Sequence, residues 1–392
     1  MQPFFKSIRI NNLLSFGPDS PPIELGPLNV IIGTNGSGKS NLFDVLALLK
    51  NSPGEFDKPI RESGCPLKEW FWKSTENEVQ PVNIEAIIPI DHFSFSHHIV
   101  FGGDERLIFT EETIRMPSCV RISVGSGEDM KGSVMSLGSN NEGKVTASTG
   151  GNRSVLSFLR FSLSSKYDEH IKPESAIFID FYQSLHIYNN WTHGRKSPLR
   201  FAQLGYLPDK WLNEDGSNLG VVLKKIKNHE ESHLRFSGFL KQLYEGVDDY
   251  EIDEYKDGTL RVYLREGERI IHAARLSDGT LRYLMLLAVL CDPEPPPVVC
   301  IEEPEMGLHP DLIMVMGDAL RYASERTQVI VTTHSVRLVD CFNDSPEVIQ
   351  VCEKHEGQTA IKRLDPEKMS VWLDEYRLGD LWTSGEIGGN RW

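Results

Sequence analysis

Gly33, Gly38, Lys39 and Ser40 follow the spacing G-x-x-x-x-G-K-S. Glycines at such positions let successive backbone N–H groups turn inward around an anion. The lysine then reaches the outer phosphates of a nucleotide, and the serine hydroxyl ligates Mg²⁺. We expect this segment to hold the phosphates of a nucleotide with Mg²⁺, the alternative being a chance glycine-rich turn. The expected contact residues are Gly33, Thr34, Asn35, Gly36, Ser37, Gly38, Lys39, Ser40 and Asn41.

Two carboxylates follow another apolar run further along the chain. Residues 298–301 read VVCI, and Glu302, Glu303 and Pro304 come directly after them. Sites of α/β proteins lie at the carboxyl ends of strands. Strand alternation would send the two acids to opposite faces. We assign Glu302, with Ser40, to the magnesium shell and Glu303 to activating the attacking water. A pair of surface acids is the alternative.

Two further segments carry candidate residues. His334 ends QVIVTTHS, a predicted strand, where an imidazole could donate to a transferring phosphoryl group. In LSDGT, Ser277 is expected to cap a helix, and Gly279 would allow close approach of a phosphate. A structural histidine and a plain capped helix are the alternatives.

The elements that would position these residues alternate between strands and helices. Residues 28–32 predict a buried strand before the glycine-rich loop, and Leu42, Val45, Leu46 and Leu49 recur at helical spacing after it. The helix would direct its N-terminal dipole at the bound anion. Residues 276 to about 364 repeat the alternation, which implies parallel strands with right-handed crossovers.

The ordered set GTNGSGKS, LSDGT, CIEEPE and TTHS resembles the ABC-type ATPases of the SMC, RecF and OLD group, especially the RecF-like bacterial "AAA family" ATPases without a nuclease domain. SIRINNLLSFGP, GSNLGVVL and LWTSGEIGG also resemble segments of that group. The resemblance implies an α/β, P-loop ATPase head with a mixed sheet, an antiparallel β subdomain and an inserted helical lobe. It also implies a head-to-head homodimer, in which Ser277, Asp278 and Gly279 of one chain meet ATP held by the other.

The sequence departs from the family pattern at several positions. Asp278 replaces the usual second glycine of the signature, and its charge would weaken closure unless it points away. Glu302 stands where relatives have the magnesium aspartate. Leu13 and Leu14 occupy positions that are basic in relatives, and Gln183 is a candidate for the glutamine near magnesium.

We expect three zones along the chain. Residues 1–125 form the N-terminal part of the ATPase head, with the phosphate loop and antiparallel strands. Residues 126–250 hold an inserted flexible tract and a helical lobe, and residues 251–392 hold the signature, the acids, His334 and a tail. In the tail, apolar side chains between Trp372 and Trp382 predict one short amphipathic helix, which packs on its own domain or docks a partner.

Composition narrows the class of protein. The chain has 392 residues and a net charge of −15, which argues against a broadly basic nucleic-acid surface. The basic clusters 195–200 and 224–227 are interpreted as solvated faces, with a local groove as the alternative. The cysteines show no C-x-x-C pair, and no apolar run spans a membrane, so we expect reduced thiols and a cytoplasmic protein.

The predicted activity is Mg²⁺-dependent hydrolysis of ATP by a dimeric switch. The insertion is too short for the coiled coils of SMC rods, and the segment after His334 is too short for the nuclease domain of OLD proteins. The first hypothesis is an ATPase that controls a separately encoded effector, a nuclease or toxin, in bacterial anti-phage defence. The alternative is a RecF-like DNA clamp in repair or replication. A transporter subunit fits least, and a higher oligomer and DNA binding stay open.

Overall fold

The computed structural model describes residues 3–73, 80–90, 93–115, 121–125, 134–136, 144–146, 154–157, 160, 173–189, 191 and 194–389. A mixed six-stranded sheet lies at its centre, in the order β10-β15-β16-β3-β17-β18. The strands are β3 (Leu28–Ile32), β10 (His186–Tyr188), β15 (Val298–Glu302), β16 (Gln328–Thr332), β17 (Ile349–His355) and β18 (Gln358–Arg363). All neighbours are parallel except β17 and β18, so five carboxyl ends meet at one edge.

The central strand β3 is buried on both faces. Ile31 packs into one hydrophobic cluster, whereas Val30 and Ile32 pack into the other. This division follows from the alternation of side chains along a strand. A continuous apolar run is therefore what a strand between two covered faces requires.

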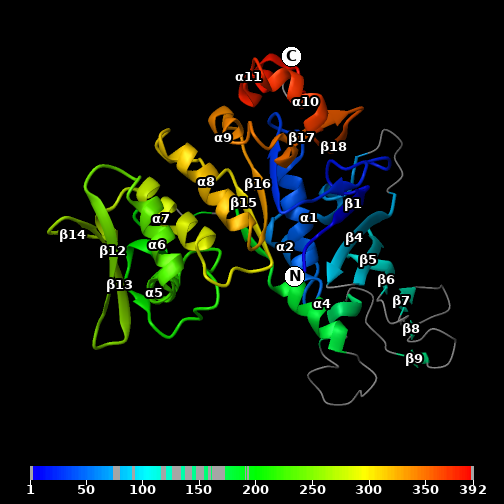
Figure 1. The fold of residues 1–392 in the computed structure, drawn as a ribbon. Helices are drawn as coiled ribbons and strands as arrows, with labels where there is room; N and C mark the ends of the chain where they lie inside the picture. The colour runs from blue at the N-terminus through cyan, green and yellow to red at the C-terminus, as the bar shows by residue number, and fades with distance from the viewer. Residues whose placement is uncertain are drawn as a thin grey trace.

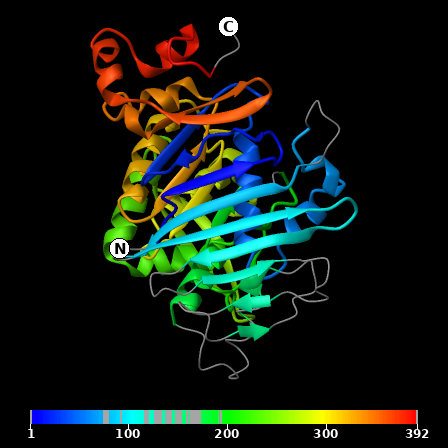
Figure 2. The same ribbon diagram turned by 90° about the vertical axis from the view of Figure 1, so that its right-hand side faces the viewer.

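A second, antiparallel sheet covers one side of the molecule (Figure 2). Its order is β2-β1-β4-β5-β6-β7, with β1 (Ser7–Asn11), β2 (Ile23–Glu24), β4 (Val82–Ile90), β5 (Phe93–Gly102), β6 (Ile108–Arg115) and β7 (Arg121–Gly125). Helix α1 (Lys39–Asn51) shares one core cluster with this sheet, through Leu42, Phe43 and Leu46. The helix after the phosphate loop is thus held between the two sheets. Helices α2 (Lys58–Glu62) and α4 (Pro173–Gln183) lie on the same side (Figure 1).

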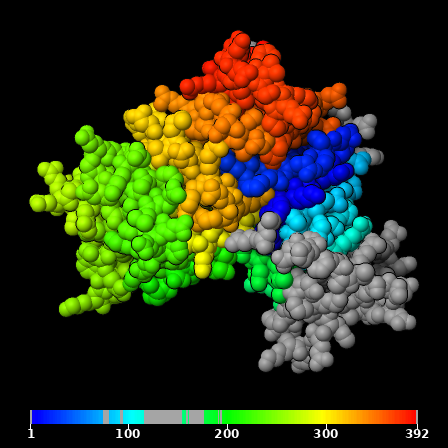
Figure 3. Space-filling model, viewed as in Figure 1, coloured from blue at the N-terminus to red at the C-terminus, as the bar shows by residue number. Residues whose placement is uncertain are grey.

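The opposite face of the central sheet carries a third sheet and further helices, most of them on the left of Figure 1, and the same residues form the left part of Figure 3. The helices are α5 (Leu219–Asn228), α6 (Glu230–Leu240), α7 (Asp278–Leu290), α8 (Leu312–Ser324) and α9 (Val336–Asp340). The sheet contains β11 (Gln203–Leu204), β12 (Val247–Glu254), β13 (Thr259–Glu266) and β14 (Arg269–His272). Strand β12 crosses residue 250, the boundary predicted between the second and third zones, and that division stays a prediction.

The tail forms two helices rather than the single one predicted. Helix α10 (Pro366–Leu373) ends before α11 (Leu378–Ser384) begins. Leu378, Leu381 and Trp382 are buried, whereas Trp372 and Tyr376 are 42% and 50% exposed. The N–H of Gly379 donates to Asp340 of α9, so α11 packs on its own domain.

Other expectations concern smaller features. The tract from Gly125 to Arg153 lies largely outside the described residues, which include there Gly125 at the end of β7 and the antiparallel strands β8 (Val134–Ser136) and β9 (Lys144–Thr146). Cys65, Cys291, Cys300, Cys341 and Cys352 are free thiols, as predicted. Among the helices that the structure describes, none is both long and apolar enough to cross a bilayer.

Candidate functional site

The phosphate loop connects the carboxyl end of β3 to the first turn of α1. Gly38 has a φ of 111°, and a Cβ there would lie 2.3 Å from Thr359 Oγ1. Only glycine satisfies both the left-handed backbone and the close approach. Lys39 is buried, and its Nζ donates to the carbonyls of Gly33 at 2.8 Å and Thr34 at 2.9 Å. Burial lowers the pKa of Lys39, and the nearby Cys352, Glu303 and Glu302 oppose that shift.

A cavity of about 410 Å³ opens above this loop. It joins the loop to the carboxyl ends of β15 and β16, and its lining residues are Asn35, Gly36, Gly38, Lys39, Ser40, Asn41, Glu302, Glu303, Thr332, His334 and Lys354. Ser40 Oγ donates to Glu302 Oε1 inside it. The structure therefore brings together the loop, both acids and His334.

Glu302 and Glu303 line the same cavity, which differs from the expectation that they face opposite ways. Strand β15 ends at Glu302, and Glu303 has a φ of 46°. The left-handed backbone turns the Glu303 side chain back toward the cavity, so strand alternation no longer applies. Glu303 Oε1 lies 3.6 Å from His334 Nε2. Burial, followed by the charge of Lys39, lowers the pKa of His334, whereas the charges of Glu303, Glu305 and Glu302 oppose that shift.

Glu305 connects the segment that carries Glu302 and Glu303 to the segment that carries His334. Its Oε1 accepts from Thr333 Oγ1 at 2.6 Å and from the His334 N–H at 3.0 Å. The turn after β15 and the end of β16 are thus fixed relative to each other. Glu305 was not among the predicted site residues, although it stands in the same EEPE segment.

The β17–β18 hairpin supports the loop from the other side. Thr359 Oγ1 donates to the Ser37 carbonyl at 2.6 Å and contacts Ser15 Oγ at 2.7 Å. Ser15 Oγ also accepts from the Asn41 amide at 2.6 Å. Lys354 of β17 adds a cation to the cavity lining. Thr359 and Lys354 stand in no motif, so only the fold reveals them.

Asp44 is a second acid near Glu302 that the sequence analysis missed. It lies one helical turn after Ser40 on α1. Burial, reinforced by the charge of Glu302, raises the pKa of Asp44 to about 6. The i, i+4 spacing from Ser40 was the available signal.

Ser277, Asp278 and Gly279 are not part of the cavity lining within one chain. Ser277 is the N-cap of α7, as predicted, and its hydroxyl accepts from the Thr280 N–H at 3.0 Å. A Cβ on Gly279 would lie 2.3 Å from the Gly307 carbonyl. The start of α7 is therefore packed tightly on the turn that follows Glu303.

Asp278 points toward its own chain. Its Oδ1 accepts from Arg200 Nη2 at 2.6 Å and from the Gly194 N–H at 3.0 Å. Arg200 also donates to the carbonyls of Ala274 and Leu276. The interpretation of Arg200 as part of a solvated face is wrong, because its side chain is only 12% exposed.

Gln183 does not lie beside the cavity. Helix α4 ends at Gln183, before β10 begins, and β10 runs parallel to β15. Gln183 is therefore at the amino edge of the sheet, whereas Glu302 is at the carboxyl edge. Asn189, which directly follows β10, is at the carboxyl edge instead.

A second cavity of about 340 Å³ adjoins the first, because Asn41 and Lys354 line both. Its other lining residues are Leu14, Ser15, Glu69, Phe71, Trp72, Lys73 and Gly357. Leu13 is fully buried and lies outside it. Aromatic and apolar walls beside a phosphate loop are suited to a nucleobase.

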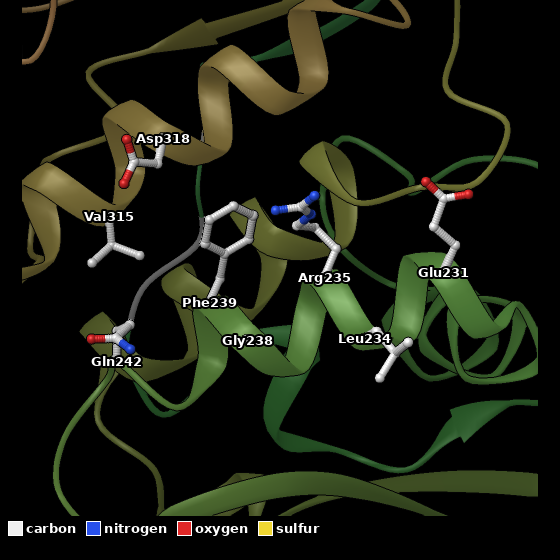
Figure 4. Close-up of a pocket in the computed structure, with 8 residues that line it drawn as sticks. All are labelled: Glu231, Leu234, Arg235, Gly238, Phe239, Gln242, Val315 and Asp318. Carbon is white, nitrogen blue, oxygen red and sulfur yellow. The ribbon is translucent and has the colours of Figure 1, made fainter.

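A third cavity, of about 560 Å³, lies away from the phosphate loop (Figure 4). Arg235 and Phe239 of α6 face Val315 and Asp318 of α8 across it. It contains none of the residues assigned to phosphate or metal.

The residues around the first cavity fit a triphosphate with Mg²⁺. Ser40 and Glu302 supply hard oxygen donors, which Mg²⁺ prefers. Thr332 Oγ1 is buried beside them and has no hydrogen-bond partner within the described part of the chain. A polar atom left in this way is suited to a water or ligand oxygen.

The fold and the loop together define an ATPase of the ABC type found in SMC heads. The SMC head bound to the winged-helix domain of ScpA is 16% identical, with a TM-score of 0.58 over 93% of this chain and 99% of that one. The head with an extended coiled coil bound to ScpA from Pyrococcus furiosus is 15% identical, with a TM-score of 0.56 over 95% and 99%. The head from Pyrococcus yayanosii is 12% identical, with a TM-score of 0.51 over 95% and 99%. At these identities the similarity establishes the fold.

The chain belongs to the family described as "AAA domain, putative AbiEii toxin, Type IV TA system", whose model matches residues 28–112 and 188–340. The predicted resemblance to SMC-like ABC ATPases and the predicted fold class are therefore confirmed. No curated protein matches the chain.

Proposed function

We propose that this protein is a Mg²⁺-dependent ATPase that works as a homodimer with two shared sites. The observation that carries the proposal is the cavity that joins Lys39, Ser40 and Glu302 to Glu303 and His334. Ser277 lies outside that cavity, at the exposed start of α7. One chain thus holds the phosphate loop and the acids, and a second chain supplies the signature segment.

Each side chain in the cavity has a chemical role in this proposal. Lys39 and the N–H groups of residues 33–41 hold the phosphates. Ser40 and Glu302 would hold Mg²⁺, which when bound stabilises negative charge on the phosphate oxygens. Glu303 orients and deprotonates the attacking water, and the imidazole of His334 donates a hydrogen bond to the transferring group. The second cavity, with Leu14, Phe71 and Trp72, takes the base.

Closure of the dimer would depend on the γ-phosphate. Ser277 and Gly279 gain contacts only when that group is present on the partner, so each nucleotide state has its own interface energy. Hydrolysis then loosens the two chains. The protein is in this sense a switch. In this proposal residues 1–125 and 251–392 form the two parts of the ATPase head, and residues 126–250 form the inserted lobe.

The output of the switch is proposed to be control of a separately encoded effector, a nuclease or toxin, in cytoplasmic anti-phage defence. The family description names a putative toxin of a type IV toxin–antitoxin system, and the SMC heads of similar fold bind ScpA. Both support a head that works with a protein partner. Co-purification of a second chain that survives high salt would support this output. Steep loss of DNA binding with added salt would instead support the RecF-like clamp.

Mixing two inactive variants tests the shared site. Lys39→Ala removes the phosphate ligand, and Ser277→Arg blocks the signature. If sites are shared across chains, an equimolar mixture forms one intact site per mixed dimer and regains up to about a quarter of wild-type turnover, since half of randomly paired dimers are mixed and each has half the sites. A mixture as inactive as either variant alone would overturn the shared site.

A further inference from the structure

Arg282 is a buried arginine that reaches from α7 to the backbone of the two acids. Its residue is 3% exposed. Its Nη2 donates to the Glu303 carbonyl at 2.7 Å and to the Glu302 carbonyl at 3.3 Å. On the other side, its guanidinium lies 5.0 Å from the centre of the Trp191 ring. The side chain is thus held between an aromatic ring and the end of β15.

The Glu303 carbonyl that Arg282 contacts belongs to a strained residue. Glu303 has a φ of 46°, a conformation that disfavours residues with a Cβ and persists only where neighbours fix it. Its N–H donates to the Thr332 carbonyl at 2.9 Å, and its carbonyl also accepts from the Met306 N–H at 3.0 Å. Because this backbone conformation turns the Glu303 carboxylate into the cavity, whatever holds the carbonyl also aims the carboxylate.

Arg282 is the side chain that links this carbonyl to the signature helix. Helix α7 has Ser277 as its N-cap, and Arg282 lies in its second turn. A helix moves as a rigid unit over so short a distance. A displacement of Ser277 is therefore passed to the Arg282 guanidinium and from there to the Glu303 carbonyl.

We propose that Arg282 is a positioning residue for Glu303 and couples the placement of that carboxylate to helix α7. The inference rests on the proposed role of Glu303 in hydrolysis. A lysine at position 282 would keep the positive charge but would lose the planar guanidinium, which lies over the Trp191 ring while its Nη2 donates to the Glu303 and Glu302 carbonyls.

Arg326 provides a matched control elsewhere in the chain. It also donates to backbone carbonyls, those of Leu290 and Asp292, and its guanidinium lies 4.3 Å from the Tyr322 ring centre. Arg326 and Arg282 both have an Nε with no hydrogen-bond partner within the described residues. The two arginines differ in that Arg326 holds the far end of α7, away from Glu303. Arg326→Lys therefore measures the structural cost of such a substitution alone.

The test compares kcat, the KM for ATP and thermal stability in single and double variants. We expect Arg282→Lys to lower kcat at least tenfold and to leave the KM within about twofold. Arg326→Lys should lower the melting temperature by a similar amount and leave kcat near wild type. In a Glu303→Gln background, followed by single-turnover hydrolysis, Arg282→Lys should cause no further decrease.

Two outcomes would overturn the inference. One is a kcat for Arg282→Lys equal to the kcat for Arg326→Lys. The other is an equal fold-decrease in hydrolysis when Arg282→Lys is introduced into the wild type and into Glu303→Gln. If Arg282→Lys does not fold, Trp191→Phe loosens the guanidinium instead and should lower kcat at least twofold, again only when Glu303 is present. An ineffective Glu303→Gln would overturn the proposed function itself, and the two failures are therefore distinguishable.

Discussion

Arg200 Nη2 lies 2.6 Å from Asp278 Oδ1, so the acid of the LSDGT segment, the proposed signature, pairs with an arginine of its own chain. Asp278 is half-exposed, whereas Arg200 is nearly buried and also holds the carbonyls just before α7. The negative charge of Asp278, which would repel a phosphate held by a second chain, is therefore already paired with Arg200.

Removing Arg200 should expose that repulsion. Arg200→Gln removes the arginine that pairs with Asp278, and a negative charge near a phosphate at a partly exposed site costs on the order of 1–2 kcal/mol. We expect ATPase activity at a fixed protein concentration to fall about tenfold, with ATP binding to the isolated chain unchanged. Adding Asp278→Gly to Arg200→Gln should restore most of the activity. No restoration would mean that Arg200 acts through folding rather than through charge.

Lys39→Ala should abolish ATP binding, measured by isothermal titration calorimetry. Lys39 is buried against the loop carbonyls and is the cation that would contact the outer phosphates. Lys50→Ala, in the last turn of the same helix and paired with Glu214, serves as the control and should bind normally. Normal binding by Lys39→Ala would refute the assignment of the cavity to phosphate.

Glu303→Gln should bind ATP but hydrolyse it at least a hundredfold more slowly, because the amide cannot take a proton from water. The closed dimer should accumulate with ATP and Mg²⁺, which light scattering detects as a doubling of mass. Glu325→Gln, at the end of α8, is the control and should stay as active as wild type. Wild-type turnover by Glu303→Gln would contradict its role.

Asp44 should make stability depend on pH when Mg²⁺ is removed with EDTA. Its pKa is about 6 in the folded protein and 3.8 in the unfolded chain, so the folded state binds its proton more tightly. This term stabilises the fold fully below pH 3.8 and is lost as pH rises through about 6. Asp44→Asn should therefore raise the free energy of unfolding by about 2 kcal/mol at pH 7.5 and by clearly less at pH 5. Equal gains at both values would show that the Asp44 carboxyl is not the cause.

Trp72→Ala should weaken ATP binding about tenfold and leave tripolyphosphate binding unchanged, since loss of an aromatic wall costs about 1–3 kcal/mol of base stacking. The comparison separates contacts to the base from contacts to the phosphates. Trp372→Ala, on the exposed face of the tail, is the control. Equal loss for both ligands would place the base elsewhere.

Much of the fold could be predicted from local patterns. The segment VNIEAIIPI alternates as half-buried strands do, and DLIMVMGDALRYASE repeats at helical spacing. They became β4 and α8. Each of these elements buries one face or stripe against a single core, so its pattern survives in the sequence.

Predictions failed where the backbone departs from regular secondary structure, and where two interacting side chains are far apart in the sequence. Strand alternation separated Glu302 from Glu303, but the positive φ of Glu303 reunites them. The pairing of Arg200 with Asp278 joins residues far apart in the chain, so neither local charge pattern revealed it. In the tail, one helix was predicted where α10 ends at Leu373 and α11 begins at Leu378, because the spacing of apolar residues alone does not reveal a turn between two helices.

The β17–β18 hairpin has a practical consequence for anyone trimming the polypeptide. The family model stops at residue 340, yet Thr359 and Cys352 both contact the carbonyl of Ser37 in the phosphate loop. A shortened version cut at that limit would retain GTNGSGKS, LSDGT, CIEEPE and TTHS but would lose the hairpin that contacts the phosphate loop. Recombinant fragments meant to capture the catalytic unit should therefore extend at least through Arg363, the last residue of β18.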